Sequence, residues 1–323
     1  MKVLLQRCSI AMLCVAIASV AQAKEFPERA ITLIIPFSAG GVTDQVSRLV
    51  AVKAADNLGV PVVIENRPGG GGQIAISGVR QAAADGHTLL VGDIGTHAIN
   101  VSLYSKLSYD PVKDFIPVTE LVEMPHVLVV PADSPYKSIE DLVAGARAKP
   151  GSLTYGSVGI GSGAHLLGEM LKSLKGIEIV HLPYRGSSQI VPDLMSNRIA
   201  LFFGAVGSMA PLIESGQLRA LVVTDSERAP LLPTVASAKE AGIPGLDLKV
   251  WFGILAPAGT PDDAVHKLNV EFVKALSDPL IKQRLTEWGG RIIGNDPGEF
   301  AKVIASETER LGKVVKSSGA RLD

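Results

Sequence analysis

Residues 31–44 have the sequence ITLIIPFSAGGVTD, and this stretch decides the fold class. The run Ile31–Ile35 is apolar and β-branched and is ended by a proline, which is the pattern of a buried strand. Small residues from Ser38 to Gly41 form a turn, and a helix is expected from Thr43 to Leu58, with Gly59 ending it. A buried strand that leads through a glycine turn into a helix indicates an α/β fold with a parallel sheet.

The same order of elements repeats along the chain. Strands at 61–64 and 88–91, with a helix between them that ends near Ala84, complete a βαβαβ unit. A second series follows, with strands at 127–130, 153–155, 177–182, 199–203 and 218–224 and helices at 138–148, 162–175 and 188–195. Beyond residue 261 the chain is expected to be mostly helical, ending in an amphipathic helix over 297–316. About 300 residues exceed what one core usually serves, so two α/β domains are expected, each a mainly parallel sheet flanked by helices.

The first 23 residues have the pattern of a cleavable secretory signal peptide. Lys2 and Arg7 precede an apolar stretch over residues 10–20, and Ala21-Gln22-Ala23 is a small-x-small cleavage site. The apolar stretch is much shorter than the roughly 20 residues of a membrane-spanning helix. Cleavage after Ala23 and release into the periplasm are therefore predicted.

The two cysteines, Cys8 and Cys14, both lie in this leader. The mature chain would therefore hold no thiol and no disulfide, although disulfides persist in the periplasm. A lipoprotein is not expected, because Arg7 and Leu13 stand where a small residue should precede the acylated cysteine.

The mature chain is expected to be mildly acidic. Removing the leader takes away Lys2 and Arg7 and no acid, which leaves 29 basic against 32 acidic side chains. Nucleic acids and anionic membrane surfaces attract basic patches, so neither is an expected partner.

Three strand-to-helix junctions, at 36–44, 156–162 and 183–188, are rich in small residues. In open parallel sheets ligands bind at this edge, and the free N–H groups of helix N-termini favour an anion such as a carboxylate. Glycine lets the main chain approach an oxyanion closely. Ordinary tight turns would show the same composition, but three such loops favour a ligand site. The candidate residues are Phe37, Ser38, Ala39, Gly40, Gly41, Thr43, Ser157, Gly159, Gly161, Ser162, Tyr184, Arg185 and Gly186.

Four further side chains have two possible roles each. His165, in the first turn of a helix, and His97 could contact the ligand or pack in the core. Asp93 follows a strand and could face the ligand site, or could form an Asx-type turn or cap. Thr96, three residues later, is a further candidate ligand contact. Asp44 stands four residues before Arg48 at a helix start, so a structural ion pair is favoured over a ligand contact.

Catalytic and cofactor motifs are poorly supported. The segment 159–164 matches G-x-G-x-x-A, but the acidic residue expected at the end of the next strand is missing. No G-x-S-x-G, P-loop or H-E-x-x-H motif occurs. We therefore expect no cofactor, no metal and no catalysis. Two alternatives stay open: a secreted esterase or lyase using Ser162 or Ser157 with His165, and a sensory module that presents a ligand to a membrane receptor.

Seven motifs in order resemble the Bug-type (tripartite tricarboxylate transporter) solute-binding proteins, and the resemblance covers essentially the whole mature chain. They lie at 36–44 (PFSAGGVTD), 65–70 (ENRPGG), 85–89 (DGHTL), 155–161 (YGSVGIG), 183–186 (PYRG), 219–224 (RALVVT) and 256–261 (APAGTP).

The resemblance implies a two-domain periplasmic binding protein fold of the type with two interdomain crossovers. Domain 1 would comprise residues 24–124 and 252–323, and domain 2 residues 125–251, with the ligand cleft between them. A small organic acid, held by backbone amides of the loops at 37–43 and 157–162, is the implied ligand, and tripartite-type membrane permease subunits are the implied partner of a monomer. The family often has an acidic residue that can meet the amino group of an amino acid ligand, at the position where this chain has Gly204. Gly204 is therefore a candidate site residue, and a di-, tri- or aromatic carboxylate is favoured over an amino acid.

Overall fold

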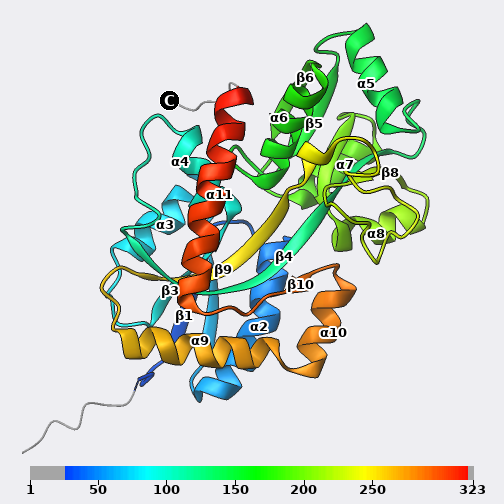
Figure 1. The fold of residues 1–323 in the computed structure, drawn as a ribbon. Helices are drawn as coiled ribbons and strands as arrows, with labels where there is room; N and C mark the ends of the chain where they lie inside the picture. Colours follow the sequence, from blue (N-terminus) through cyan, green and yellow to red (C-terminus); the bar gives the residue numbers. More distant parts are fainter. Residues whose placement is uncertain (1–25, 319–323) are drawn as a thin grey trace, which may run out of the picture.

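The computed structural model describes residues 26–318, and its strands form one curled ten-stranded sheet (Figure 1). The predicted leader and its cleavage site lie outside these residues. The strands are β1 (Ile31–Ile35), β2 (Val62–Asn66), β3 (Thr88–Asp93), β4 (Phe115–Pro131), β5 (Leu153–Ser157), β6 (Ile179–Pro183), β7 (Leu201–Ala205), β8 (Leu218–Val223), β9 (Lys249–Pro257) and β10 (Arg291–Ile292).

Helices flank the sheet along the whole described chain. They are α2 (Val42–Leu58), α3 (Gln73–Arg80), α4 (Asn100–Leu103), α5 (Ile139–Ala148), α6 (Gly163–Lys175), α7 (Ser187–Met195), α8 (Val206–Glu214), α9 (Asp262–Leu276), α10 (Pro279–Glu287) and α11 (Pro297–Ser318), with short helical segments η1 (Gly70–Gly72), η2 (Gly95–Ile99) and η3 (Pro244–Leu246).

The sheet contains two parallel sets joined by two long antiparallel strands. Strand β1 pairs in parallel with β2 and β3, and β5 pairs in parallel with β6 and β7. Between these sets, β9 pairs with β3 and β4, while β4 pairs with β7, all antiparallel. Figure 1 shows β4 and β9 running together from the lower set to the upper one. The carboxyl ends of both parallel sets thereby face the same region.

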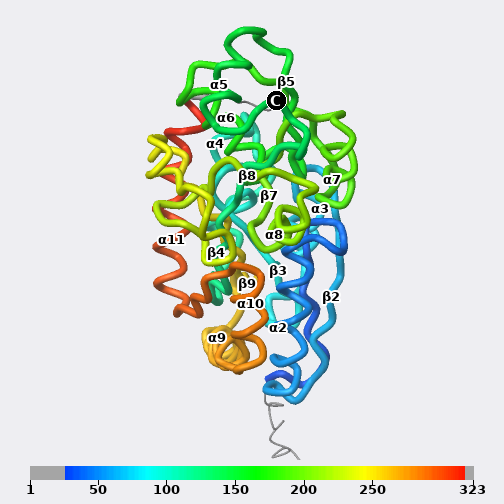
Figure 2. Tube along the Cα trace, turned by 90° about the vertical axis from the view of Figure 1, so that its right-hand side faces the viewer, coloured from blue at the N-terminus to red at the C-terminus, as the bar shows by residue number. Residues whose placement is uncertain are grey.

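Helix α11 packs along both parts of the molecule. It contacts η2, α4, β4 and α6, because Phe300, Ile304, Leu311 and Val315 form one buried apolar stripe. Viewed from the side, α11 and α2 lie on opposite sides of β4 and β9 (Figure 2). Helices α2 and α11 therefore cover opposite faces of the part of the sheet that holds β1 to β3.

The elements around residues 31–44 are confirmed. Strand β1 has its predicted bounds, α2 begins one residue before the predicted start, and Gly59 ends it in the left-handed conformation. The strand predicted at 127–130 is only the end of β4, in which Pro117 and Pro125 interrupt the sequence pattern and two register shifts accommodate the irregularity. Helices α4 and α8, segment η2 and strand β9 were not predicted, and α3 ends at Arg80 rather than near Ala84.

Candidate functional site

A cleft opens where the carboxyl ends of the strands meet, and we call it the central cleft. Its predicted members are Phe37, Ser38, Ala39, Gly41, Thr43, Asp93, Ser162, Arg185 and Gly186. The other residues that line it are Val42, His126, Val158, Gly163, Ala164, Ser187, Ser188, Phe202, Phe203, Ala205, Ser208, Met209, Val250 and Phe252. Four of these, Val42, Val158, Ser187 and Ser188, lie within the three predicted junctions, although they were not singled out there. His126, Ala205, Ser208, Met209, Val250 and Phe252 lie on elements, or parts of elements, that the sequence did not predict. Phe202 and Phe203 lie on the strand predicted at 199–203, but no local pattern showed that they face the cleft.

An adjoining pocket continues from the central cleft and shares Phe37, Asp93, Val158, Ser162 and Arg185 with it. This pocket brings in four more of the predicted residues, Thr96, Gly159, Gly161 and Tyr184, together with the glycine run 69–72. Backbone thus forms much of its surface, as expected where main-chain groups approach a ligand closely.

Four helices begin at the central cleft: α2, α6, α7 and α8. The N-cap residues of α2, α7 and α8 are Gly41, Gly186 and Ala205, and none of them provides a side-chain cap. The fourth helix, α6, is capped by Ser162. The first N–H groups of a helix have no partner within it, and the helix dipole adds a partial positive charge there. The cleft thus gathers the positive ends of four helices, three of which have no side-chain cap.

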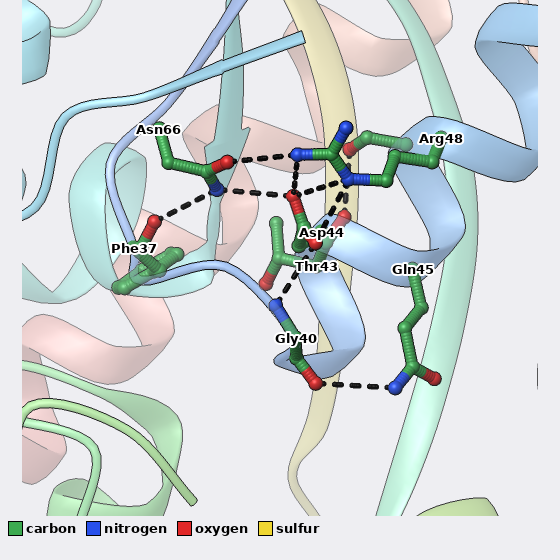
Figure 3. A network of polar contacts seen from close by, with 8 residues as sticks. Phe37, Gly40, Thr43, Asp44, Gln45, Arg48 and Asn66 are labelled. Carbon is green, nitrogen blue, oxygen red and sulfur yellow. Dashed lines mark hydrogen bonds and ion pairs between the residues drawn. The ribbon is translucent and has the colours of Figure 1, made fainter. Parts of the chain in front are cut away.

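The first of these helices is held by a polar network around Asp44, which Figure 3 shows in detail. The buried Asp44 carboxylate accepts hydrogen bonds from Gly40 N (2.9 Å), Asn66 Nδ2 (3.0 Å) and Arg48 Nε (3.0 Å). Asn66 also donates to the Phe37 carbonyl (3.0 Å). Burial would raise the pKa of Asp44, but the bonds from Arg48, Gly40 and Asn66 hold it below its ordinary value. The carboxylate therefore fixes the loop that leads into α2.

The expectation for Asp44 and Arg48 is thus confirmed, and Gly40 has a related part. Gly40 does not line either pocket; its N–H group is used by Asp44 and its φ is +84°. It shapes the loop, while its neighbours Ala39 and Gly41 face the cleft.

The side chains of Ser157 and His165 hydrogen-bond to the main chain of the loop at 157–162 and line neither the central cleft nor the adjoining pocket. Ser157 Oγ donates to Gly159 O (2.9 Å) and accepts a hydrogen bond from Gly159 N (3.2 Å). His165 Nδ1 accepts from Gly161 N (3.3 Å), and its ring stacks on His181 at 4.2 Å between centroids. Burial lowers the pKa of His165, so a neutral ring supports the loop.

The serine–histidine pairs proposed for hydrolysis do not form in the described residues. Ser162 Oγ donates to Gly159 O (2.7 Å) and caps α6 by accepting from His165 N (3.3 Å), which is a backbone group. Ser157 Oγ instead lies 2.6 Å from His181 Nε2, but Ser157 is fully buried and away from the cleft.

Asp93 combines both of its expected roles. It lines the central cleft and the adjoining pocket, and its Oδ1 accepts hydrogen bonds from Thr96 N and Oγ1, both at 2.9 Å. This is a cap at the start of η2. Burial raises the pKa of Asp93 to about 6, and the bonds from Thr96 only partly offset that effect.

His97 and Gly204 lie away from both pockets. His97 is fully buried beside Tyr109 and Phe115, with ring centroids 6.4 and 5.3 Å away. Burial lowers the pKa of His97 to about 3, so the ring is neutral, and it packs in the core instead of lining either pocket. Gly204 is buried within β7, where a Cβ would meet Met209 Cγ at 2.5 Å. His97 lies in a π-helix over Gly95–Ile99, which has no simple sequence pattern.

The loops on the two sides of the cleft touch directly. Ser38 Oγ donates to Arg185 O (3.3 Å), and a Cβ at Gly95 would lie 2.6 Å from Gly161 O. A Cβ at Gly161 would overlap Asn100 Oδ1. Glycine is thus needed for this close approach of main chains.

Among residues 26–318, no group of three or more acidic, histidine or cysteine side chains is arranged to hold a metal ion. No helix in the same part of the chain is long and apolar enough to cross a membrane.

Comparison with known proteins gives a consistent family. The family model described as the tripartite tricarboxylate transporter family receptor matches residues 46–320. Protein BugT of Bordetella pertussis is 34% identical over 95% of this chain and 94% of its own length. A protein of R. palustris solved with adipate is 37% identical, with a TM-score of 0.87 over 91% of this chain and 99% of that one. MatC of Rhodopseudomonas palustris, solved with bound malate, is 35% identical, with a TM-score of 0.86 over 90% and 100% of the two chains.

Proposed function

The chain belongs to the tripartite tricarboxylate transporter receptor family, and we propose that it captures a small organic acid in the central cleft and delivers it to a tripartite-type membrane permease. The relatives solved with adipate and malate carry carboxylate ligands and share the fold over nearly the whole chain. In this role the chain binds and releases its ligand unchanged.

One observation carries the proposal. Four helices begin at the central cleft, and among the described residues that line it Asp93 is the one carboxylate and Arg185 the one cation. Unpaired helix N–H groups and a guanidinium favour a carboxylate strongly in a partly desolvated site. The Asp93 carboxyl is held by Thr96, which limits its repulsion of an anion.

The remaining features follow from that role. We propose that the leader directs export to the periplasm with cleavage after Ala23, and that the mature chain acts as a monomer. We further propose that residues 24–124 with 252–323 and residues 125–251 are the two domains, which close on the ligand about β4 and β9. The loop residues Phe37 to Thr43 and Gly159 to Ser162 would then meet the carboxylate from opposite sides.

A thermal-shift and calorimetry experiment tests the proposal. Adipate or malate at 100 times its Kd should add about 2.7 kcal/mol to the free energy of unfolding, raising Tm by several degrees. Adipamide has the same carbon chain without charge and is the control, and it should leave Tm unchanged. Organic-acid capture is contradicted if mono-, di-, tri- and aromatic carboxylates all fail to shift Tm, or if the diamide works as well as the diacid.

A further inference from the structure

The long strands β4 and β9 have a second face, turned away from the central cleft. Side chains alternate between the two faces of a strand, so Val250 and Phe252 line the cleft while Trp251, between them, lies on the other side. A separate pocket of about 340 Å³ is found on that side, which α11 covers (Figure 2), and we call it the rear pocket. Its charged lining residues are Glu123, Asp247, Lys249, Glu307 and Arg310.

The rear pocket lies between helix α11 and the segment that leads from η3 into β9. Glu307 and Arg310 belong to α11, whereas Asp247 and Lys249 belong to the segment opposite. Arg310 Nη1 donates a hydrogen bond to Asp247 O (3.3 Å) and so connects the two sides. A pocket of this size between separate elements can hold a small molecule.

Trp251 provides the observation that points to a ligand. The residue is 2% exposed, and its ring packs edge-on against Phe300, with centroids 5.3 Å apart. Its Nε1–H group is buried and has no hydrogen-bond partner among the described residues. The indole nitrogen can only donate a hydrogen bond, and a buried donor is costly to leave unpaired. The rear pocket therefore lacks an oxygen acceptor, which a ligand can supply.

The charged groups of the rear pocket leave one carboxylate without a direct partner. The others form the ion pairs Glu123–Arg291, Glu307–Arg310 and Lys249–Asp225. The Asp247 carboxylate forms no hydrogen bond or ion pair with another described residue; burial raises its pKa, and Lys249 only partly opposes that effect. Three carboxylates against two cations give the lining a net charge of −1, so the rear pocket is short of a positive charge.

We propose that the rear pocket is a second binding site, for a small amine that also carries a hydroxyl or ether oxygen. The ammonium group meets Asp247, and the oxygen accepts the hydrogen bond from Trp251 Nε1. An organic anion is disfavoured, because the net negative charge of the lining repels it. The site therefore differs in ligand class from the central cleft and does not depend on the capture of an organic acid there.

Nuclear magnetic resonance of the ¹⁵N-labelled mature chain tests the site, with ethanolamine as the probe at neutral pH and constant chloride. Residues 24–323 contain two tryptophans, Trp251 and Trp288, and Trp288→Phe identifies the indole signal of Trp251. Ethanolamine should move that signal downfield in a saturable way, because the N–H group gains an acceptor. So small a ligand binds weakly, and a Kd on the order of 1 mM is expected.

Two probes matched in size separate the charge from the oxygen. Ethylamine has the ammonium group without the oxygen, and ethylene glycol has the oxygen without the charge. Each should bind more weakly than ethanolamine by about tenfold or more. Equal shifts from all three compounds would overturn the proposed ligand class. A Trp251 signal that stays unmoved up to about 0.1 M ethanolamine, a hundred times the expected Kd, would show that solvent alone fills the rear pocket.

A variant pair tests the carboxylate. Asp247→Asn removes the charge at nearly constant shape and should weaken ethanolamine binding by about tenfold. Asp133→Asn makes the same change at an exposed position that does not line the rear pocket, and it should leave the Kd unchanged. An equal loss in the two variants would overturn the assignment to Asp247.

Trp251→Phe tests the donor. It keeps an aromatic ring beside Phe300 but removes the N–H group, so ethanolamine should bind more weakly. The backbone amide signal of Gly245, which lines the rear pocket, reports binding in this variant. Circular dichroism and Tm show whether each variant is folded. Undiminished binding in folded Trp251→Phe would overturn the role of the indole N–H group.

Discussion

Asp44 influences the site without lining it. Its carboxylate holds Gly40, Arg48 and Asn66, and through Asn66 the carbonyl of Phe37 (Figure 3). We expect Asp44→Ala to lower the free energy of unfolding by about 1–2 kcal/mol, since buried charged hydrogen bonds are lost while Arg48 remains half exposed. Binding of a carboxylate should weaken about tenfold as the loop loosens, measured by urea unfolding and calorimetry.

The control for this variant is Glu309→Ala, which breaks the exposed pair with Lys313. Its effect on the free energy of unfolding should stay within about 0.5 kcal/mol, and ligand affinity should not change.

The Asp44 network should also depend on pH. Because the pKa of Asp44 is depressed, the stability that Asp44 contributes is present above pH 3.8 and is lost as the pH falls through the lower pKa of the folded state. Equal stabilities of Asp44→Ala and the control would contradict the network's role.

Asp93 predicts the opposite pH dependence. Burial raises its pKa from 3.8 to about 6, so between these values the folded chain binds more protons than the unfolded chain. Stability due to this group is therefore greatest below pH 3.8 and falls as the pH rises to about 6, by about 3 kcal/mol. Asp93→Asn removes this titrating group, so the stability of the variant relative to the wild type should increase as the pH rises from 4 to about 6. Urea unfolding from pH 4 to 8 measures the difference.

The same residue should make ligand affinity depend on pH. Asp93 lines the central cleft, and its charged form repels a carboxylate there. The wild type should therefore bind a carboxylate more tightly at pH 6 than at pH 8, relative to Asp93→Asn. Measuring both proteins in parallel cancels the effect of titrating the ligand itself. Parallel pH profiles for the two proteins would show that Asp93 carries no such charge.

At the level of single residues, the sequence predicts which residues lie near one another better than it predicts the direction in which their side chains point. The Asp44–Arg48 pair follows from the i,i+4 rule and is present as expected. The side chains of His97, Ser157 and His165 occupy positions beside the site but turn away from it. Their direction depends on the π-helix after Asp93 and on the stacking of His165 on His181, which no local pattern specifies.

The loop from β5 to α6 is the element whose main chain we expect to matter most. Gly161 has φ of +84°, and a Cβ there would overlap Asn100 Oδ1 across the cleft. Gly161→Ala should therefore reduce carboxylate affinity at least tenfold, with little change in far-UV circular dichroism, because it separates the two sides that meet there. Calorimetry with adipate measures the loss.

Gly151 provides a matched control for this loop. It has a similar φ of +73°, but a Cβ there meets no atom within 4 Å. Both alanine variants should lose about 1–2 kcal/mol of stability from the left-handed backbone, and only Gly161→Ala should lose binding. Unchanged affinity in Gly161→Ala would remove this contact from the site.

Elements with a clean local pattern were predictable, and elements defined by distant pairing were not. Strand β1 and helix α2 follow from residues 31–44 alone. Strand β4 carries Pro117, Glu120, Glu123 and Pro125, which suit a strand only because β9 and β10 pair beside it. The missed strand β9 and helix α8 hold Val250, Phe252 and Met209, so this part of the cleft could not be derived from the sequence.

For the whole molecule, closure of the cleft can be tested with a disulfide. The residues 24–323 contain no cysteine, and a Cβ at Gly186 would lie 3.9 Å from Ser38 Cβ, which suits a disulfide. Gly186 has extended backbone at φ of 178°, so another residue fits there. The oxidised double variant Ser38→Cys, Gly186→Cys should exchange ligand far more slowly than its reduced form.

Stopped-flow release of a fluorescent competitor, with and without reductant, measures this exchange. The single variants Ser38→Cys and Gly186→Cys are controls and should exchange at the wild-type rate under both conditions. Ligand exchange that is unaffected by oxidation would show that the loops do not separate to admit the ligand.

The convergence of α2, α6, α7 and α8 on one cleft also affects the empty protein. Their positive ends repel one another when nothing lies between them, so closing without cargo is electrostatically unfavourable. An organic anion acts as the missing counter-ion and turns that repulsion into attraction. In the proposed role, binding of the anion would therefore favour the closed conformation of the cleft. A membrane partner that recognises only this closed conformation would not bind the protein without its ligand.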